Sequence, residues 1–157
     1  MKKYLVLDMD GTLVDFYGVD GWQHYLDDLQ DETPYRVAKP FYNPMVLNNT
    51  LNKLKRQGWT IIINSWLSKT KTEDFHNRIR NAKLEKLNEL QIPYDMIFFL
   101  DYGTDKQNCI RHLGGIQVLV DDNADIRASW NGPTIDATKN IIPILNKLES
   151  IVEYETN

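Results

Sequence analysis

Residues 4–15 read Tyr4-Leu5-Val6-Leu7-Asp8-Met9-Asp10-Gly11-Thr12-Leu13-Val14-Asp15, and the remaining chain can be arranged around this stretch. The four mostly apolar residues from Tyr4 to Leu7 predict a short buried strand. Two carboxylates follow one residue apart, and Gly11 then permits a sharp backbone turn. Because burying two unpaired carboxylates is unfavourable, we expect a cation beside them. Mg²⁺ is the natural candidate, since it is a hard ion that takes oxygen ligands.

The stretch from Asp8 to Val14 resembles the first motif of the haloacid-dehalogenase-like (HAD) superfamily. Its Asp-x-Asp-Gly-Thr form resembles the phosphatase branch of that superfamily. The alternative is that both acids are solvated turn residues after an edge strand. Few turns need two acids at this spacing, so we favour the HAD resemblance.

Length and composition indicate an ordinary globular chain. Its 157 residues suit one domain with a core large enough to fold alone. The net charge of −4 argues against non-specific binding of nucleic acid. The single cysteine, Cys109, excludes an internal disulfide and fits a reducing compartment. No apolar run approaches the length of a membrane span, and Met1-Lys2-Lys3 leaves no room for a cleaved signal peptide. We therefore expect a cytoplasmic protein without a membrane partner.

Residues 16–43 are rich in aromatic and acidic side chains and are too few for a separate domain. We expect a single domain, with a core of about residues 1–15 and 44–157 and an insertion of about residues 16–43. The insertion is either a surface excursion over the core or a small cap whose aromatic side chains line a substrate pocket. HAD proteins carry caps directly after the first motif. The resemblance therefore implies a cap at the position of this insertion. A short helix is expected in it, with an apolar face made of Trp22, Tyr25, Leu26 and Leu29.

A strand–helix–strand pattern follows the insertion. Asn43 and Pro44 predict the start of a helix that Gly58 ends, and Trp59–Ile63 predicts a buried strand. This order favours a parallel sheet. The apolar stripe of the helix consists of Val46, Leu47, Leu51 and Leu54.

Asn64 and Ser65 end that strand and resemble the second HAD motif, in which an apolar strand ends in Ser or Thr. A small hydroxyl there can donate a hydrogen bond to a phosphate oxygen without adding charge. The family places the hydroxyl directly after the apolar residues, whereas here Asn64 has that place and Ser65 comes next. Either residue can hold the phosphate; we favour Ser65, with Asn64 and nearby backbone amides assisting.

Two lysines compete for the third HAD motif, a lysine before the helix that leads to the last catalytic strand. Lys106 follows a predicted buried strand, Met96–Leu100, and stands at the expected start of a short helix. A lysine there opposes the helix dipole, which makes sense if Lys106 faces a phosphate and several carboxylates. Lys83 lies within a long helix that Thr72 is expected to cap, and it ranks second because its side chain must reach farther. We expect its loss to matter much less. The apolar side of this long helix consists of Phe75, Ile79, Ala82, Leu87 and Leu90.

Asp121 and Asp122 follow another apolar run and resemble the fourth HAD motif, whose two acids complete the metal site. Alone, the pair could be the N-cap and a first-turn acid of the next helix. Together with Asp8 and Asp10, two strand ends that each carry an acid pair indicate one shared cation. Asp125 is a candidate outer ligand.

The expected architecture is α/β. Five strands that alternate with helices predict right-handed crossovers in a three-layer fold with a mostly parallel sheet. The polar clusters fall at the carboxyl ends of strands, where open α/β sheets bind ligands. Thr134 and Ile135 predict a short edge strand, and the resemblance over residues 4–15 and 44–152 implies a Rossmann-like HAD core with a reduced cap. One terminal helix is expected, with an apolar side made of Ile141, Ile142, Leu145, Leu148 and Ile151.

The HAD resemblance implies a Mg²⁺-dependent phosphatase that hydrolyses a phosphomonoester through an aspartyl-phosphate. Asp8 would attack phosphorus, and Asp10 would protonate the leaving oxygen and then act as base on water. Ser65 and Lys106 would hold the phosphate oxygens, with Asn64 and Lys83 as further phosphate-binding candidates. The implied metal ligands are Asp8, the backbone carbonyl of Asp10, and Asp122 with Asp121 beside it.

The substrate is expected to be a small phosphorylated compound. The overall pattern faintly resembles phage-type and 5′-nucleotidase-like members, so the alternative is a 5′-nucleotidase or a polynucleotide-end phosphatase. Aromatic rings in residues 16–43 can stack on a base. Two other classes are a phosphotransferase, which needs a larger cap, and a non-catalytic phosphate-binding module, against which the intact acids argue.

Overall fold

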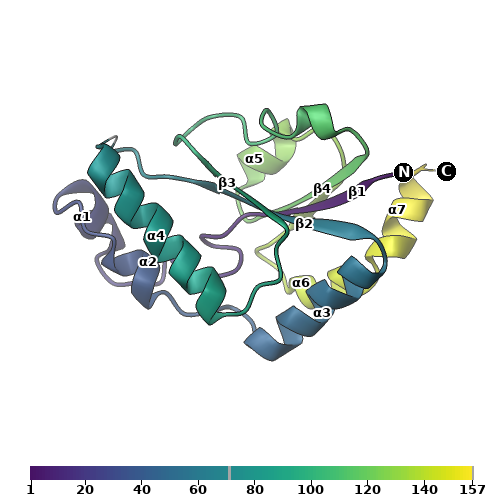
Figure 1. Cartoon of the computed structure of the whole chain (residues 1–157), viewed down its shortest axis with the longest axis horizontal. Coiled ribbons are helices and arrows are strands. Elements are labelled where there is room, and N and C mark those ends of the chain that lie inside the picture. Colours follow the sequence, from purple (N-terminus) through teal and green to yellow (C-terminus); the bar gives the residue numbers. More distant parts are fainter. Residues whose placement is uncertain (71, 157) are drawn as a thin grey trace.

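The computed structural model describes residues 1–70 and 72–156. Within these ranges the chain forms a five-stranded sheet with the order β3-β2-β1-β4-β5, in which neighbouring strands run parallel (Figure 1). The α/β class and the parallel sheet predicted from the sequence are confirmed. The strands are β1 (Lys3–Leu7), β2 (Trp59–Trp66), β3 (Met96–Leu100), β4 (Ile116–Asp121) and β5 (Thr134–Asp136).

The strand register aligns the polar residues that follow β1, β2 and β4. Leu7 pairs with Ile63 on one side and with Val120 on the other. The next residue on each of the three strands is therefore polar: Asp8, Asn64 and Asp121. Because parallel strands point the same way, these residues share one row at the carboxyl edge of the sheet.

Helices cover both faces of the sheet. One face packs against α3 (Pro44–Arg56), α6 (Ile141–Leu145) and α7 (Leu148–Thr156), around alternate strand residues such as Leu5 and Ile63. The other face packs against α5 (Ala124–Ser129) and the segment that contains the 3₁₀ turn Arg111–Leu113, around Val6 and Ile62. Alternation of side chains along each strand produces these two apolar layers.

The long helix α4 (Glu73–Glu89) lies beside the two short helices of the insertion, α1 (Trp22–Asp27) and α2 (Thr33–Val37), as Figure 1 shows. Phe75, Ile79 and Ala82 of α4 form a cluster with side chains of the insertion. The last turn of α4 joins the main core instead, through Leu87 and Leu90. This helix therefore ties the insertion to the sheet.

Several local expectations were wrong. Met96–Leu100 is only partly buried, because β3 is an edge strand with a neighbour on one side. Lys106 does not begin a helix: residues 106–110 form turns, held by tertiary hydrogen bonds that the sequence does not reveal. The expected terminal helix is divided into α6 and α7. Two residues placed on apolar stripes are largely exposed, Leu29 at 54% and Val46 at 46%.

Other local expectations were confirmed. Asn43 caps α3, since its Oδ1 accepts hydrogen bonds from the backbone amides of Met45 and Val46. Thr134 and Ile135 lie in the short edge strand β5. Among the described helices, none combines the length and hydropathy that a membrane span requires.

Candidate active site

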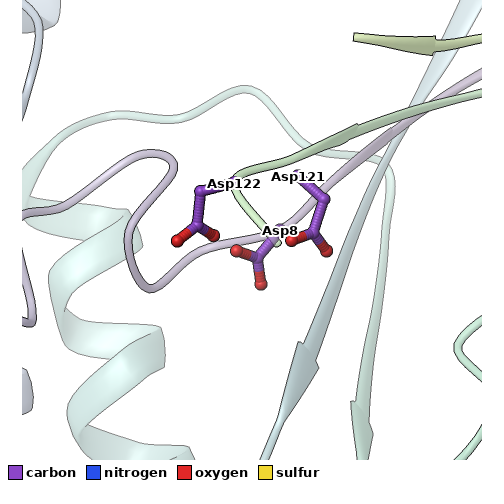
Figure 2. Close-up of side chains that lie close together, drawn as sticks. All are labelled: Asp8, Asp121 and Asp122. Carbon is purple, nitrogen blue, oxygen red and sulfur yellow. The ribbon is translucent and has the colours of Figure 1, made fainter. Parts of the chain in front are cut away.

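Three carboxylates meet at the carboxyl edge of the sheet. Asp8 follows β1, Asp121 is the last residue of β4, and Asp122 comes next (Figure 2). Each offers an oxygen atom, and these oxygens lie within 4.8 Å of one another. Asp8 and Asp121 are buried, and Asp122 is partly buried. The sequence placed these acids at strand ends, and the register described above brings them together.

Lys106 neutralises part of this acidic cluster. Its Nζ donates to Asp8 Oδ1 at 2.8 Å and to Asp121 Oδ2 at 2.9 Å. Burial alone would lower the pKa of this ammonium, but the charges of Asp8 and Asp121 raise the pKa above its usual value. Lys106 is therefore a permanent cation that fixes the orientation of Asp8.

The loop after β1 supplies two further supports. The Thr12 hydroxyl donates to Asp8 Oδ2 at 2.9 Å and lies 3.4 Å from Asp122 Oδ1. Gly11 has a φ of +81°, and a Cβ at this position would lie only 2.4 Å from Asp122 Oδ2. Glycine thus provides both the left-handed backbone and the space that Asp122 occupies. Both residues belong to the quoted first motif; the turn at Gly11 was predicted, whereas the space that it leaves for Asp122 and the contacts of Thr12 were not.

The cluster carries more negative charge than Lys106 offsets. Burial and the neighbouring Asp8 raise the pKa of Asp122 to about 7. The pKa of Asp121 is also raised, by burial and by Asp8, although Lys106 opposes the shift. Converging carboxylate oxygens are the donor set that a hard divalent cation prefers, and a cation there would offset the repulsion that contributes to these raised pKa values. Asp8, Asp121 and Asp122 therefore fit Mg²⁺.

Lys83 and Asp10 form a second charged pair beside the cluster. The Lys83 side chain is fully buried, and its Nζ donates to Asp10 Oδ2 at 2.9 Å, to Ser65 Oγ at 2.7 Å and to the Trp66 carbonyl at 2.8 Å. Lys83 was ranked second because its side chain must reach farther from its helix, and the structure shows that it does reach Asp10 and the end of β2. Burial raises the pKa of the Asp10 carboxyl above its usual value, although Lys83 opposes the shift.

Solved structures share this architecture. A chain from a structure described as the Pnkp1/Rnl/Hen1 RNA repair complex superposes with a TM-score of 0.55 at 24% identity, over 87% of this chain and 42% of that one. A HAD-like phosphatase from Mesorhizobium loti superposes with a TM-score of 0.51 at 17% identity, over 78% of this chain and 64% of that one.

The chain therefore shares its fold with a structure described as a HAD-like phosphatase. It spans less than two thirds of the length of either matched chain. No protein-family model matches the sequence, and no curated protein matches it. The similarity to known proteins is therefore one of architecture, with the motif residues of this chain at the strand ends.

Within this HAD-like fold, Asn64 and Ser65 point in opposite directions. Ser65 accepts from Lys83, whereas Asn64 Nδ2 donates to the carbonyl of Lys106 at 2.8 Å. Asn64 is fully buried, and its Oδ1 has no hydrogen-bond partner among the described residues. The hydrogen bond from Asn64 Nδ2 holds the backbone of Lys106 in place.

The outer ligand expected at Asp125 is absent from the cluster. Asp125 is exposed in the first turn of α5, and the acids whose oxygens converge within the described residues are Asp8, Asp121 and Asp122. Asn123, rather than either acid of the pair, caps this helix. Asp121 is fixed in the cluster, because its carbonyl accepts from Arg127, one carboxylate oxygen accepts from the Asn123 amide and the other accepts from Lys106.

A cavity of about 310 Å³ opens over the acids. Asp8, Asp10 and Lys106 line its floor together with Asp121 and Asp122. Ser65 and Lys83 do not line the cavity; Lys83 holds Asp10 from behind, and Ser65 accepts a hydrogen bond from Lys83. The rest of the wall is rich in aromatic side chains, which are Phe16, Tyr17, Trp22, Tyr35, Trp66 and Tyr102.

Proposed function

We propose that this chain is a phosphatase that hydrolyses a phosphomonoester with Asp8 as nucleophile. The orientation of Asp8 carries the proposal. This buried carboxylate lies at the floor of a cavity, with one oxygen bonded to Lys106 and the other to Thr12. A carboxylate held in this way is aimed at the cavity and loses little freedom when a phosphoryl group arrives.

The two steps use Asp8 and Asp10 in turn. An Asp8 oxygen attacks phosphorus and the P–O bond to the leaving alcohol breaks, which forms an aspartyl-phosphate. Asp10 gives its proton to the leaving oxygen; its raised pKa favours the protonated form. The Asp10 carboxylate then takes a proton from water, and that water attacks phosphorus. Inorganic phosphate leaves and Asp8 is regenerated.

Lys106 supplies positive charge where the phosphoryl oxygens gather. Its ammonium faces the cavity beside Asp8, so it can hold an oxygen while negative charge develops in the transition state. Lys83 supports Asp10 from behind, and the Ser65 hydroxyl in turn accepts a hydrogen bond from Lys83. Asn64 assists Lys106 indirectly, because its side-chain amide donates to the Lys106 carbonyl and so holds that backbone.

Mg²⁺ is the cofactor that these residues fit. Asp8 and Asp122 would hold it through side chains and Asp10 through its backbone carbonyl, with Asp121 beside them. When bound, the cation offsets the repulsion between the phosphate and the carboxylates. Gly11 keeps the space for Asp122 that this arrangement requires.

We also infer that residues 16–43 act as a small cap on a single domain. Phe16 and Tyr35 of this segment are buried against α4, and both line the cavity wall. Nucleotides and polynucleotide ends are the substrate candidates that the sequence suggests. The similarity in fold to a chain of an RNA repair complex is compatible with both.

Release of inorganic phosphate from a panel of phosphorylated compounds tests the proposal. With Mg²⁺ the wild-type protein is expected to release phosphate, and Asp8→Asn is expected to release none while keeping its fold. Asp125→Asn is the matched control, since it alters an exposed acid outside the cluster. Transfer of phosphate to an added alcohol in preference to water would indicate a phosphotransferase. Binding of the compounds without release would indicate a non-catalytic module.

A further inference from the structure

The aromatic wall of the cavity contains two kinds of side chain. Phe16 and Tyr35 are only 2% and 4% exposed and pack in the cluster that joins the insertion to α4. Tyr17 and Tyr102 are 54% and 44% exposed, although they line the same cavity. The buried rings are explained by packing. Packing does not explain the exposed rings. Exposed aromatic surface at a cavity mouth is typical of a ligand site.

The rings at the mouth form two pairs from different parts of the fold. Tyr17 and Trp22 of the insertion have ring centroids 5.1 Å apart, and we call them the insertion pair. Trp66, the last residue of β2, and Tyr102, which follows β3, also have ring centroids 5.1 Å apart, and we call them the core pair.

Each pair stands beside a different part of the acidic cluster. The Tyr17 ring borders Gly11, since a Cβ there would lie 2.9 Å from its Cε2 atom. The Trp66 ring lies 5.3 Å from Lys106 Nζ. A phosphate seated at Asp8 therefore has aromatic surface on two sides.

We propose that this mouth binds the base of a nucleoside monophosphate, so that a free mononucleotide is the preferred substrate. This inference rests on the phosphatase function proposed above. Any of the bases can stack on an aromatic side chain, because every base has a planar π-face. Gln23, Ser68 and Lys69 line the same mouth and offer hydrogen-bonding groups to the edge of a base.

Cavity size and charge favour a free nucleotide over the end of a strand. The volume of about 310 Å³ lies at the low end of the usual range for small-molecule sites, about 300–1,000 Å³. Among the described residues that line the cavity, Lys69 is the cation besides Lys106, and Asp27 adds negative charge. Proteins that bind strands neutralise several phosphates with basic side chains, which this mouth does not provide.

A comparison of paired substrates tests the assignment. We expect kcat/KM for a nucleoside 5′-monophosphate to exceed that for ribose 5-phosphate, which lacks only the base, by about tenfold or more. Tyr102→Ala is expected to reduce this preference ratio about fivefold or more, whereas Tyr102→Phe keeps the ring and the ratio. Phe41→Ala is the matched control, because Phe41 is 46% exposed and lies outside the cavity.

Binding to the Asp8→Asn protein gives a second readout that does not need turnover. Calorimetry is expected to show tighter binding of the monophosphate than of ribose 5-phosphate, and Tyr102→Ala is expected to remove the difference. Equal affinity for the two compounds, or a ratio unchanged in Tyr102→Ala, would overturn the base site even if phosphate is released. Turnover of a 5′-phosphorylated oligonucleotide without turnover of the mononucleotide would also overturn it. Absence of phosphate release from every compound would contradict the phosphatase function instead, and the binding comparison would still decide the base site.

Discussion

At the scale of single residues, each of the two buried lysines of the site forms an ion pair with a different aspartate of the first motif. Lys106 pairs with Asp8, and Lys83 pairs with Asp10. Each ammonium lies within 2.9 Å of its carboxylate, so neither acid is left as an isolated buried charge. The proposed nucleophile and the proposed acid–base residue are thereby held independently.

Lys106→Ala should lower kcat by about two orders of magnitude or more. The reason is the loss of roughly 3 kcal/mol of stabilisation of the charge that develops on the phosphoryl oxygens. Steady-state kinetics on the best compound of the panel measures the effect. Lys139→Ala, which changes an exposed lysine, is the control. A change confined to KM would contradict the proposed role of Lys106.

Lys83→Met should lower both kcat and the melting temperature. Its removal leaves Asp10 without its buried partner, and breaking such a pair costs about 3–5 kcal/mol. For a chain of this size, thermal unfolding should shift by roughly 6 °C or more. In an Asp10→Asn background the same change should have a smaller effect, because the charge pair is already gone. Equal effects in both backgrounds would show that Lys83 acts through packing alone.

Gly11→Ala should weaken Mg²⁺ binding. The added Cβ would meet Asp122 Oδ2 at 2.4 Å and displace that carboxylate from the cluster. The Mg²⁺ concentration for half-maximal activity should rise about tenfold, an estimate based on the known sensitivity of metal sites to changes around their ligands. Gly114→Ala separates this clash from backbone strain, because Gly114 also has a positive φ, +65°, and nothing within 4 Å of the added Cβ. The control should keep normal Mg²⁺ dependence.

At the scale of elements, α4 connects the insertion to the core. Phe75 of this helix is fully buried beside Leu26 and Tyr35, and Arg78 of α4 forms an ion pair with Glu32 just before α2. The insertion therefore depends on α4 for its position. Two elements that are distant in the sequence together shape the cavity wall.

Phe75→Ala should raise KM more than a substitution elsewhere in the core that destabilises the fold by the same amount. Loss of this ring leaves a void under the insertion and destabilises the fold by about 3–5 kcal/mol. Leu54→Ala, in the core cluster that α3 forms with the sheet, should cost a comparable 2–5 kcal/mol without touching the cavity. Chemical denaturation with steady-state kinetics compares the two variants. Equal KM values at equal stability would show that the insertion does not position the cavity wall.

At the scale of the whole molecule, the carboxyl edge of the sheet gathers negative charge. Asp8, Asp121 and Asp122 come from two adjacent strands, and Lys106 is the cation that pairs with two of them. Raised pKa values mean that the folded state binds protons more tightly than the unfolded chain does. Asp121 and Asp122, whose pKa values are raised, therefore disfavour folding progressively as the pH rises from about 4 toward 7 in the absence of a cation.

Mg²⁺ should stabilise the protein more at pH 8 than at pH 5.5. With a pKa of about 7, Asp122 is ionised and ready to bind at pH 8, whereas at pH 5.5 a proton competes with the cation. The increase in melting temperature on adding Mg²⁺ measures this difference, and excess chelator should abolish phosphate release. Asp122→Asn should lose most of the Mg²⁺ effect at both pH values. An increase that is independent of pH, or full activity in chelator, would contradict the metal site.

Local patterns were sufficient to predict much of the fold. The alternation of apolar strands with helices requires crossovers, so the parallel sheet and the strand ends that carry Asp8 and Asp121 follow from periodicity and turn chemistry. Asn43 caps α3 as expected, because a cap depends only on neighbouring residues. The expected helix at Lys106 was wrong, since Asn64 donates to the Lys106 carbonyl and the Lys106 ammonium donates to Asp8 and Asp121, and these bonds hold the segment.

The sequence by itself determined the fold class, the acids of the site and the candidacy of both lysines, because these depend on residue type and spacing along the chain. Only the tertiary structure decided that Lys83 reaches Asp10, that Asn64 faces the Lys106 loop and that Asp125 stands apart. The strand register and the position of α4 over the end of β2 settle those contacts. Both depend on packing between segments far apart in the chain, which no local pattern encodes.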